Sequence, residues 1–468
     1  MKQIIFRIAT GAMLAATLTL FAAAQSNPNK NTMAAKENMD NDFKLPPLKL
    51  EQITLKNGLR VVLNQDDAIP VVSVAVYYNV GSRNEREGRT GFAHLFEHMM
   101  FQGSENVKKA EHFQFVSNAG GTMNGTTSTE RTNYFEAMPS NQLPLALWLE
   151  SDRMRSLAVT KENLDNQRNA VQEEKRLNYD NRPYGEILNI LNTMIYKNFA
   201  NSHSTIGSMS DLDAATVEDV REFFRINYAP NNAVLVISGA FDSAEAKMLV
   251  EKYFATIPAQ PAPVVVDVTE PAEVALKYKK YEDKLAPLPA FIMGWKIPAR
   301  RTPEFDALYL AGKILYDGDS SRLYQKLVKG DETVLQLFGF MDERRGPSSI
   351  NIGAIPKDAK NIPQIRQAIS DEIKQMATVG VSADEMRKLH NQLLNDEVRS
   401  RQSSLARAQA IAEYALYDGD PTLINSNLEE LLKVTPEQIK QAVAKYLNTD
   451  NHALLDVVPA GKANASQD

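Results

Sequence analysis

The residues whose types and spacing could do chemistry lie at positions 91–100, which read GFAHLFEHMM. This segment has no proline and one apolar residue after another, which predicts a buried or half-buried helix. On a helix, His94 and His98 are four positions apart and share a face, so both imidazoles can reach one ion. Zinc favours neutral imidazole nitrogen, and Glu97 beside it could take a proton from water at the metal. The order of these residues is HxxEH, the inverse of HExxH.

The alternative is that two core histidines bracket a glutamate by chance. Only six histidines occur in 468 residues, which makes this coincidence rare. Burying two His and one Glu on an apolar helix without partners would also be costly in free energy. We therefore predict a catalytic zinc site, which needs a third protein ligand and one open position.

Two further segments of the first half stand out: GGTMNGTT at 120–127 and QRNAVQEE at 167–174. Together with HLFEH at 94–98, they resemble the pitrilysin or insulinase family of zinc metallopeptidases, and in particular its half-size members that are similar to mitochondrial processing peptidase subunits. The resemblance is strong over the first half of the chain and weak over the second. It implies one zinc ion per chain and a third ligand, a Glu on a helix downstream of the histidines.

Glu173 and Glu174 both lie where the resemblance places that ligand. Helical phase separates them, because Leu164, Val171 and Glu174 fall on one inward stripe while Glu173 is turned by about 100° toward solvent. We predict Glu174 as the ligand. The family often carries another Glu seven positions earlier, where this chain has Gln167. An amide there can still donate and accept hydrogen bonds to the ligands, but it brings no charge.

Four residues, Gly121, Thr122, Met123 and Asn124, resemble the family's edge strand, on which an extended substrate adds by main-chain pairing. Such pairing would explain how varied sequences are accepted. The alternative is a glycine-rich hairpin that binds nothing.

Proline residues mark the best domain boundary in the chain, since Pro258, Pro261, Pro263 and Pro271 flank an apolar run. Each half ends with a helix (217–227 and 436–447) that leads into an apolar strand (233–237 and 453–458), which suggests a repeat. We expect an α+β protein of two similar α/β-sandwich domains, each a mostly antiparallel sheet packed with helices. The expected divisions are a zinc-binding domain at 48–257, a linker at 258–274, an inactive repeat at 275–460 and a tail at 461–468.

The second half lacks the residues that would make a second site. The expected counterpart of the zinc helix, at 306–315, holds no histidine. In the family this half presents an Arg and a Tyr seven positions apart that stabilise the developing charge at the scissile carbonyl, and the matching positions here are Val328 and Leu335. Arg322 and Tyr324 match a Ser-Arg-Leu helix whose role is packing. The resemblance therefore implies a partner: a similar zinc-free subunit that supplies Arg and Tyr, or a second copy of the chain.

The N-terminus is typical of a secretory signal. A basic start is followed by an apolar stretch at 8–21 and by Ala22, Ala23 and Ala24, so we predict a signal peptide at 1–24 and a disordered tether at 25–47. A single anchoring helix is the alternative, although the apolar run is short for a membrane span. Absence of cysteine excludes disulfides and a lipid attached at the cleavage site.

Charge argues against a nucleic-acid partner. The formal net charge is -6, and removal of Lys2 and Arg7 would make it -8, with no cluster of basic residues. The expected function is that of a periplasmic zinc endopeptidase that hydrolyses peptides or unfolded polypeptides, with no membrane span after signal cleavage. The alternatives are a non-catalytic scaffold or assembly subunit and, fitting less well, a metal store or sensor.

Overall fold

The computed structural model describes residues 45–271, 276–448 and 450–460. The signal peptide expected at 1–24, residues 25–44 of the expected tether and the tail expected at 461–468 lie outside the described residues. Within the described ranges, no helix combines the length and the apolar character that crossing a membrane requires.

The first half contains a six-stranded sheet with the order β1-β2-β6-β3-β5-β4. Its strands are β1 (Glu51–Thr54), β2 (Arg60–Gln65), β3 (Val71–Tyr78), β4 (Thr122–Thr127), β5 (Thr132–Pro139) and β6 (Ala233–Gly239). Only β2 and β6 pair in parallel. Both β3 and β6 are rich in β-branched residues and buried on both faces, as expected for central strands that are covered on two sides.

The second half contains a five-stranded sheet with the order β7-β11-β8-β10-β9. Its strands are β7 (Lys277–Asp283), β8 (Ala290–Ile297), β9 (Val334–Asp342), β10 (Ser348–Pro356) and β11 (Ala453–Pro459). With β1 set aside, the two sheets have the same strand order, and in each the strand at one edge pairs in parallel with its neighbour while the other pairs are antiparallel. The prediction of two similar, mostly antiparallel α/β sandwiches is confirmed.

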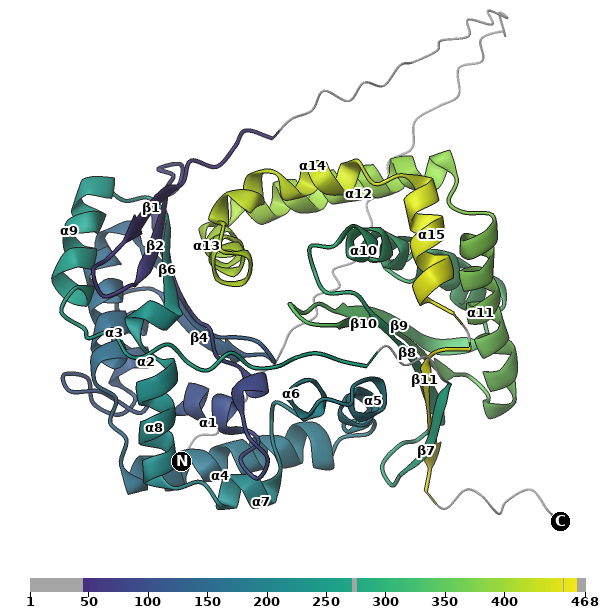
Figure 1. Ribbon diagram of the computed structural model, residues 1–468, viewed down its shortest axis with the longest axis horizontal. Helices are drawn as coiled ribbons and strands as arrows, with labels where there is room; N and C mark the ends of the chain where they lie inside the picture. Colours follow the sequence, from purple (N-terminus) through teal and green to yellow (C-terminus); the bar gives the residue numbers. More distant parts are fainter. Residues whose placement is uncertain (1–44, 272–275, 449, 461–468) are drawn as a thin grey trace, which may run out of the picture. The chain divides into compact units, whose positions relative to one another are not determined.

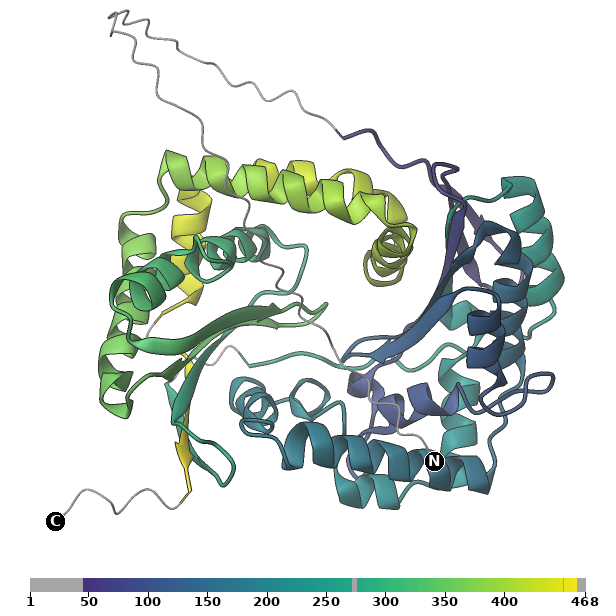
Figure 2. The same cartoon turned by 180° about the vertical axis from the view of Figure 1, so that it is seen from behind.

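The described residues contain fifteen α-helices, which pack on the sheets or on one another. Those of the first half are α1 (Phe92–Met99), α2 (Glu111–Asn118), α3 (Leu143–Arg155), α4 (Lys161–Lys175), α5 (Ile187–Ile195), α6 (Phe199–Ser202), α7 (Met209–Asp213), α8 (Val217–Asn227) and α9 (Ser243–Phe254). Those of the second half are α10 (Pro303–Leu315), α11 (Ile362–Thr378), α12 (Ala383–Gln402), α13 (Ser404–Glu413), α14 (Asn427–Leu432) and α15 (Pro436–Tyr446). Figure 1 shows α10, α11 and α15 beside the second sheet, and Figure 2 shows the same layers from behind.

The last helices before β6 and β11 begin in the same way. Thr216 caps α8 and pairs reciprocally with Asp219, and Thr435 caps α15 and pairs reciprocally with Gln438. Each is a capping box that satisfies backbone N–H groups at a helix start. The two halves thus share this helix start as well as the helix and strand that the sequence predicts at their ends.

Each half contributes one helix that covers the sheet of the other half. Helix α13 of the second half covers one face of the first sheet, where Ile411 and Ala412 pack with Ala75 and Val236. Helix α5 of the first half covers one face of the second sheet in the same manner. Each sheet therefore has one face buried in its own half and the other covered by a helix of the other half.

Candidate metal centre

Helix α1 begins at a position that only glycine suits. Gly91 has φ of +83°, and a Cβ there would lie 2.6 Å from the carbonyl oxygen of Ile206. Glycine adopts this left-handed conformation without steric cost. From this start, Leu95, Phe96 and Met99 are almost fully buried in the core of the first half. The imidazoles of the helix consequently lie on its other side.

Helix α4 brings the third group of the site. Thr160 caps its start, and Leu164 and Val171 are buried, which sets its rotation. Glu174 lies in its last turn and faces α1. Glu173 is on the solvent side, where it forms an ion pair of 3.2 Å with Arg176. The structure therefore places these neighbours as their helical phase predicts.

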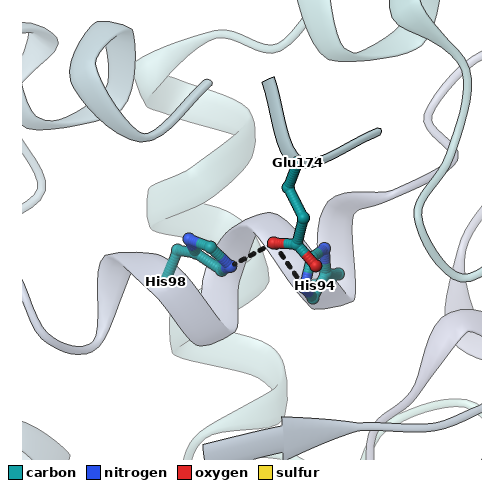
Figure 3. A group of neighbouring side chains, drawn as sticks. All are labelled: His94, His98 and Glu174. Carbon is teal, nitrogen blue, oxygen red and sulfur yellow. Dashed lines mark ion pairs between the residues drawn. The ribbon is translucent and has the colours of Figure 1, made fainter. Parts of the chain in front are cut away.

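His94, His98 and Glu174 point toward one another (Figure 3). The Oε2 atom of Glu174 lies 3.3 Å from Nε2 of His98 and 3.7 Å from Nε2 of His94. Two zinc bonds of about 2.0–2.1 Å at a tetrahedral angle place their donor atoms about 3.3 Å apart. Two imidazole nitrogens and a carboxylate oxygen with this spacing fit a zinc ion and leave a coordination position open.

The protonation of two of the three groups suits a cation, whereas a metal would have to displace a proton from His98 where that imidazole is protonated. Burial, helped by the neighbouring His98, lowers the pKa of His94 to about 4, so His94 is neutral at pH 7. Burial lowers the pKa of His98 too, but Glu174 outweighs it and the net shift is upward. The hydrogen bond from His98 lowers the pKa of Glu174, which keeps this carboxylate ionised. Metal ligands must be neutral imidazole and ionised carboxylate.

Glu97 lies beside the three groups without belonging to them. It is buried, and burial raises the pKa of its carboxyl. Thr127 at the end of β4 donates a hydrogen bond of 2.6 Å to Oε2 of Glu97. A carboxylate with a raised pKa next to the ligands is suited to accept a proton near neutral pH. Thr127 was not identified from the sequence, although it closes the GGTMNGTT segment.

Gln167 also lies at the site. Its side chain is buried two turns before Glu174 on α4 and donates a hydrogen bond of 2.8 Å to Asn166, and it lies near enough to His98 to help raise the pKa of that imidazole. An amide in this position fixes the orientation of the imidazole without adding charge.

The segment predicted to bind substrate lies at the edge of the first sheet. Gly121 precedes β4, whose only strand partner among the described residues is β5. Thr122 and Asn124 are exposed, and Met123 is half-buried. A Cβ on Gly121 would lie 2.8 Å from Cγ of Met138, so this glycine allows close packing behind the strand. The free edge of β4 ends at Thr127, next to Glu97.

A pocket of about 690 Å³ opens beside Glu174. Its walls come from both halves: Tyr179 and Tyr184 from the segment after α4, and Phe338 and Phe340 from β9. The metal centre thus adjoins a space to which both halves contribute aromatic side chains.

A second group with metal-ligand chemistry consists of His112 of α2, Glu136 of β5 and Glu150 of α3, all of them buried. Arg153 is buried with them and donates a hydrogen bond of 3.0 Å from Nε to Glu150. Burial and Glu150 hold the pKa of Glu136 well above its usual range. Because a guanidinium already supplies the positive charge and the group has no exposed member, we interpret it as a structural ion cluster.

The second half offers no such donor set in the residues that the structure describes. Helix α10 is mostly buried and contains no histidine. Val328 is half-buried against the core of this half, and Leu335 at the start of β9 is 63% exposed. Arg322 donates hydrogen bonds of 2.7 and 3.0 Å to Glu385, in keeping with the packing role expected of its segment.

Two models of one peptidase family match this chain. The model described as "Insulinase (Peptidase family M16)" matches residues 60–208, and the model described as "Peptidase M16 inactive domain" matches residues 214–393. The first match contains the three-residue centre. The second match begins before α8 of the first half and continues into the second half as far as residue 393.

Individual proteins agree with this assignment. The chain is 28% identical to zinc protease PqqE of Helicobacter pylori over 413 residues, which cover 84% of this chain and 90% of that protein. It is similar to the crystal structure of a protease from Helicobacter pylori, with a TM-score of 0.85, 26% identity and 88% and 100% of the two chains covered. The first half of the periplasmic protease PqqL from Escherichia coli has the same fold, with a TM-score of 0.73, 20% identity and 88% and 93% covered.

Proposed function

Because this chain belongs to peptidase family M16, the insulinase family, we propose that it is a zinc-dependent endopeptidase that hydrolyses peptides or unfolded polypeptides. The observation that carries the proposal is the convergence of His94, His98 and Glu174, with Glu97 beside them. The relative from Helicobacter pylori that is named a zinc protease supports it.

Each residue of the site has a separate role in the proposed reaction. His94, His98 and Glu174 would hold one Zn²⁺, which supplies a Lewis acid that polarises a peptide carbonyl and lowers the pKa of water. Glu97 takes a proton from the attacking water and passes it to the leaving amine. Thr127 holds Oε2 of Glu97 in place by its hydrogen bond. Gln167 keeps the ring of His98 oriented.

The proposed substrate is an extended chain. Residues Gly121 to Asn124 offer it the free edge of β4, where main-chain pairing depends little on side chains. That edge leads to Thr127 and Glu97, so a paired segment would continue toward the proposed base. A folded protein would first have to expose such a strand, which favours peptides and unfolded polypeptides.

We further propose that the active enzyme has two subunits. Val328 and Leu335 stand where a family member would present Arg and Tyr, and neither can stabilise negative charge. A similar zinc-free subunit would supply these groups. The alternative is that a second copy of the chain serves as the partner and helps to enclose the substrate. The compartment we propose is the periplasm, based on the signal-like residues 1–24 and on the relative PqqL, whose structure is described as that of a periplasmic protease.

The function is tested with purified protein, metal analysis and an unstructured reporter peptide. We expect one zinc per chain and hydrolysis that a chelator abolishes and zinc restores. Glu97→Gln should lower turnover by about 10²–10⁴-fold, the usual contribution of a general base, while zinc stays bound. Retained turnover in Glu97→Gln would exclude the assigned base.

The two-subunit proposal has its own experiment. A co-expressed similar chain that lacks HxxEH but has Arg and Tyr seven positions apart should raise turnover well above that of this chain alone. Val328→Arg combined with Leu335→Tyr should raise the activity of the isolated chain in the same direction. Full activity of the isolated wild-type chain, unchanged by any partner, would contradict the proposal.

The second candidate function is that of a non-catalytic scaffold or assembly subunit, which the missing Arg and Tyr favour. It predicts a purified chain that contains no zinc and hydrolyses nothing even with its partner. Metal analysis therefore separates the two candidates.

A further inference from the structure

The start of helix α1 is capped by a buried carboxylate from outside the helix. No side chain of α1 or of Gly91 caps it. Instead Glu85 accepts a hydrogen bond of 2.9 Å from the N–H of Gly91 at Oε2 and one of 2.7 Å from the N–H of Ala93 at Oε1. These N–H groups have no partner within the helix, and a negative charge at this end is stabilised by the helix dipole. The side chain of Glu85 is fully buried.

His203 holds this carboxylate from its other side. Its Nε2 lies 3.0 Å from Oε2 of Glu85, and its Nδ1 lies 2.6 Å from the carbonyl oxygen of Phe199. Because a carbonyl can only accept, Nδ1 carries a proton, and the contact between Nε2 and Oε2 must hold a second proton. Burial lowers the pKa of His203, but Glu85 outweighs it and raises the pKa overall. The ring of His203 also stacks on Phe199 at 4.2 Å and 12°.

His203 is itself held in place by its neighbours. It directly follows α6, in which Asn201 donates a hydrogen bond of 2.9 Å to Glu270 of the linker. Arg344 of the second half donates one of 2.7 Å to the carbonyl oxygen of Asn201. The pair of Glu85 and His203 thus rests on a segment that is fixed to the linker and to the second half.

The capped turn is the one that carries the first proposed ligand. Ala93, whose N–H bonds to Glu85, immediately precedes His94. Displacement of this turn would move His94 relative to His98, which lies one turn further along, and relative to Glu174 on another helix. Neither Glu85 nor His203 is among the three clustered groups, so both can act only through α1.

We propose that Glu85 and His203 form a positioning pair for the metal centre: the carboxylate fixes the first turn of α1, and the imidazole fixes the carboxylate. The inference rests on the proposed zinc site and assigns these two residues a role in it. Their loss should weaken zinc binding and slow turnover, while the affinity for peptide, which involves other surfaces, should change little.

The test compares variants in zinc affinity, measured by competition with a chromogenic chelator, and in kcat and KM. Glu85→Gln keeps the size of the side chain but loses the charge and one acceptor. We expect zinc affinity to fall by about 10- to 100-fold, as for residues that support metal ligands, with kcat falling and KM nearly constant. His203→Leu should have a similar effect, and His203→Gln a smaller one, because its amide can still donate to Glu85.

Thr205→Val is the matched control. Thr205 lies two residues from His203 on the same segment, and its hydroxyl contacts that of Ser82 at 3.2 Å rather than α1. This variant should bind zinc like the wild type. Thermal melting of all four variants shows whether they are folded.

The proposal would be overturned if Glu85→Gln kept zinc affinity and kcat within about twofold of the wild type. Such a change is well below the loss expected for a residue that supports a metal ligand. Equal losses in Glu85→Gln and Thr205→Val would do the same, since they would reflect general loosening. If the wild type binds zinc but hydrolyses no peptide, the proposed peptidase function fails while the chelator competition still decides the role of the pair.

Discussion

Apart from β1, the two halves of the molecule have the same strand order, but among the residues that the structure describes only the first half brings together a metal-binding set with an accessible position. In the first half, α1 carries His94, Glu97 and His98, and α4 adds Glu174. In the second half, α10 buries Phe305, Leu308, Leu310 and Leu315 and offers no histidine. The shared topology therefore does not create the site. The site is created by a few side chains that the first half carries, because one fold can support different functions through different side chains.

In the second half, the charged residues Arg322 and Glu385 pair with each other within the fold. Arg322 bonds to Glu385, and Glu385 also completes the capping box of Ser382 at the start of α12. These contacts join two segments of the same half. The comparison predicts that substitutions at the metal centre of the first half change zinc binding and turnover, whereas substitution of this ion pair in the second half changes stability.

His98→Ala should have the largest effect. It removes one of three donors, so zinc content should fall toward zero and turnover by about 10³-fold or more, since the metal contributes several kcal/mol to the transition state. Metal analysis and peptide hydrolysis measure both. His390→Ala, in α12 of the second half, is the control and should retain zinc. Stoichiometric zinc in His98→Ala would break the assignment.

The next contrast is between Glu174→Gln and Glu173→Gln. Glu174→Gln removes the anionic donor and should strongly weaken zinc binding, because amide oxygen is a poor zinc ligand compared with carboxylate. Glu173→Gln alters only a solvent-exposed ion pair with Arg176 and should leave zinc unchanged. Chelator competition gives both affinities. A stronger effect of Glu173→Gln would mean that α4 is rotated in solution.

Gln167→Ala should have a smaller effect at the same site. Loss of the amide beside His98 should lower zinc affinity by about 10-fold, the low end for groups that orient ligands. Gln167→Glu, which restores the residue that the family often carries, should bind zinc at least as tightly as the wild type. Unchanged affinity in Gln167→Ala would show that His98 needs no orienting partner.

Glu385→Gln should affect only stability. Burial tends to raise the pKa of Glu385, but the hydrogen bonds from Arg322 outweigh it and bring the pKa to about 2. The folded pKa lies below the ordinary value of about 4.3, so the stabilisation is present above that value and is lost as the pH falls from about 4 to about 2. With solvent screening, we expect a loss of about 1 kcal/mol at pH 7.

Urea unfolding at pH 7 and at pH 3 measures this difference, which should shrink at the lower pH. Asp384→Asn is the control, because its ion pair with Arg387 is exposed and contributes little. Loss of zinc in Glu385→Gln would contradict the prediction that this residue affects stability and not metal binding.

The sequence by itself determined the local features of the site. The HxxEH spacing puts two imidazoles on one helical face, and the apolar phase of α4 selects Glu174 over Glu173, because helical periodicity is a property of neighbouring residues. The repeat was visible for the same reason in the helix and apolar strand that end each half. The expectation that the second half has no zinc site followed from a segment without histidine.

Only the tertiary structure decided which distant segments support these residues. The bond from Thr127 to Glu97 joins a strand to a helix, and the contact of Glu85 with His203 spans 118 positions. The exchange of α5 and α13 between the sheets is of the same kind. Such contacts depend on how layers stack, and no spacing along the chain encodes them, so a single sequence shows the ligands but not the groups that hold them in place.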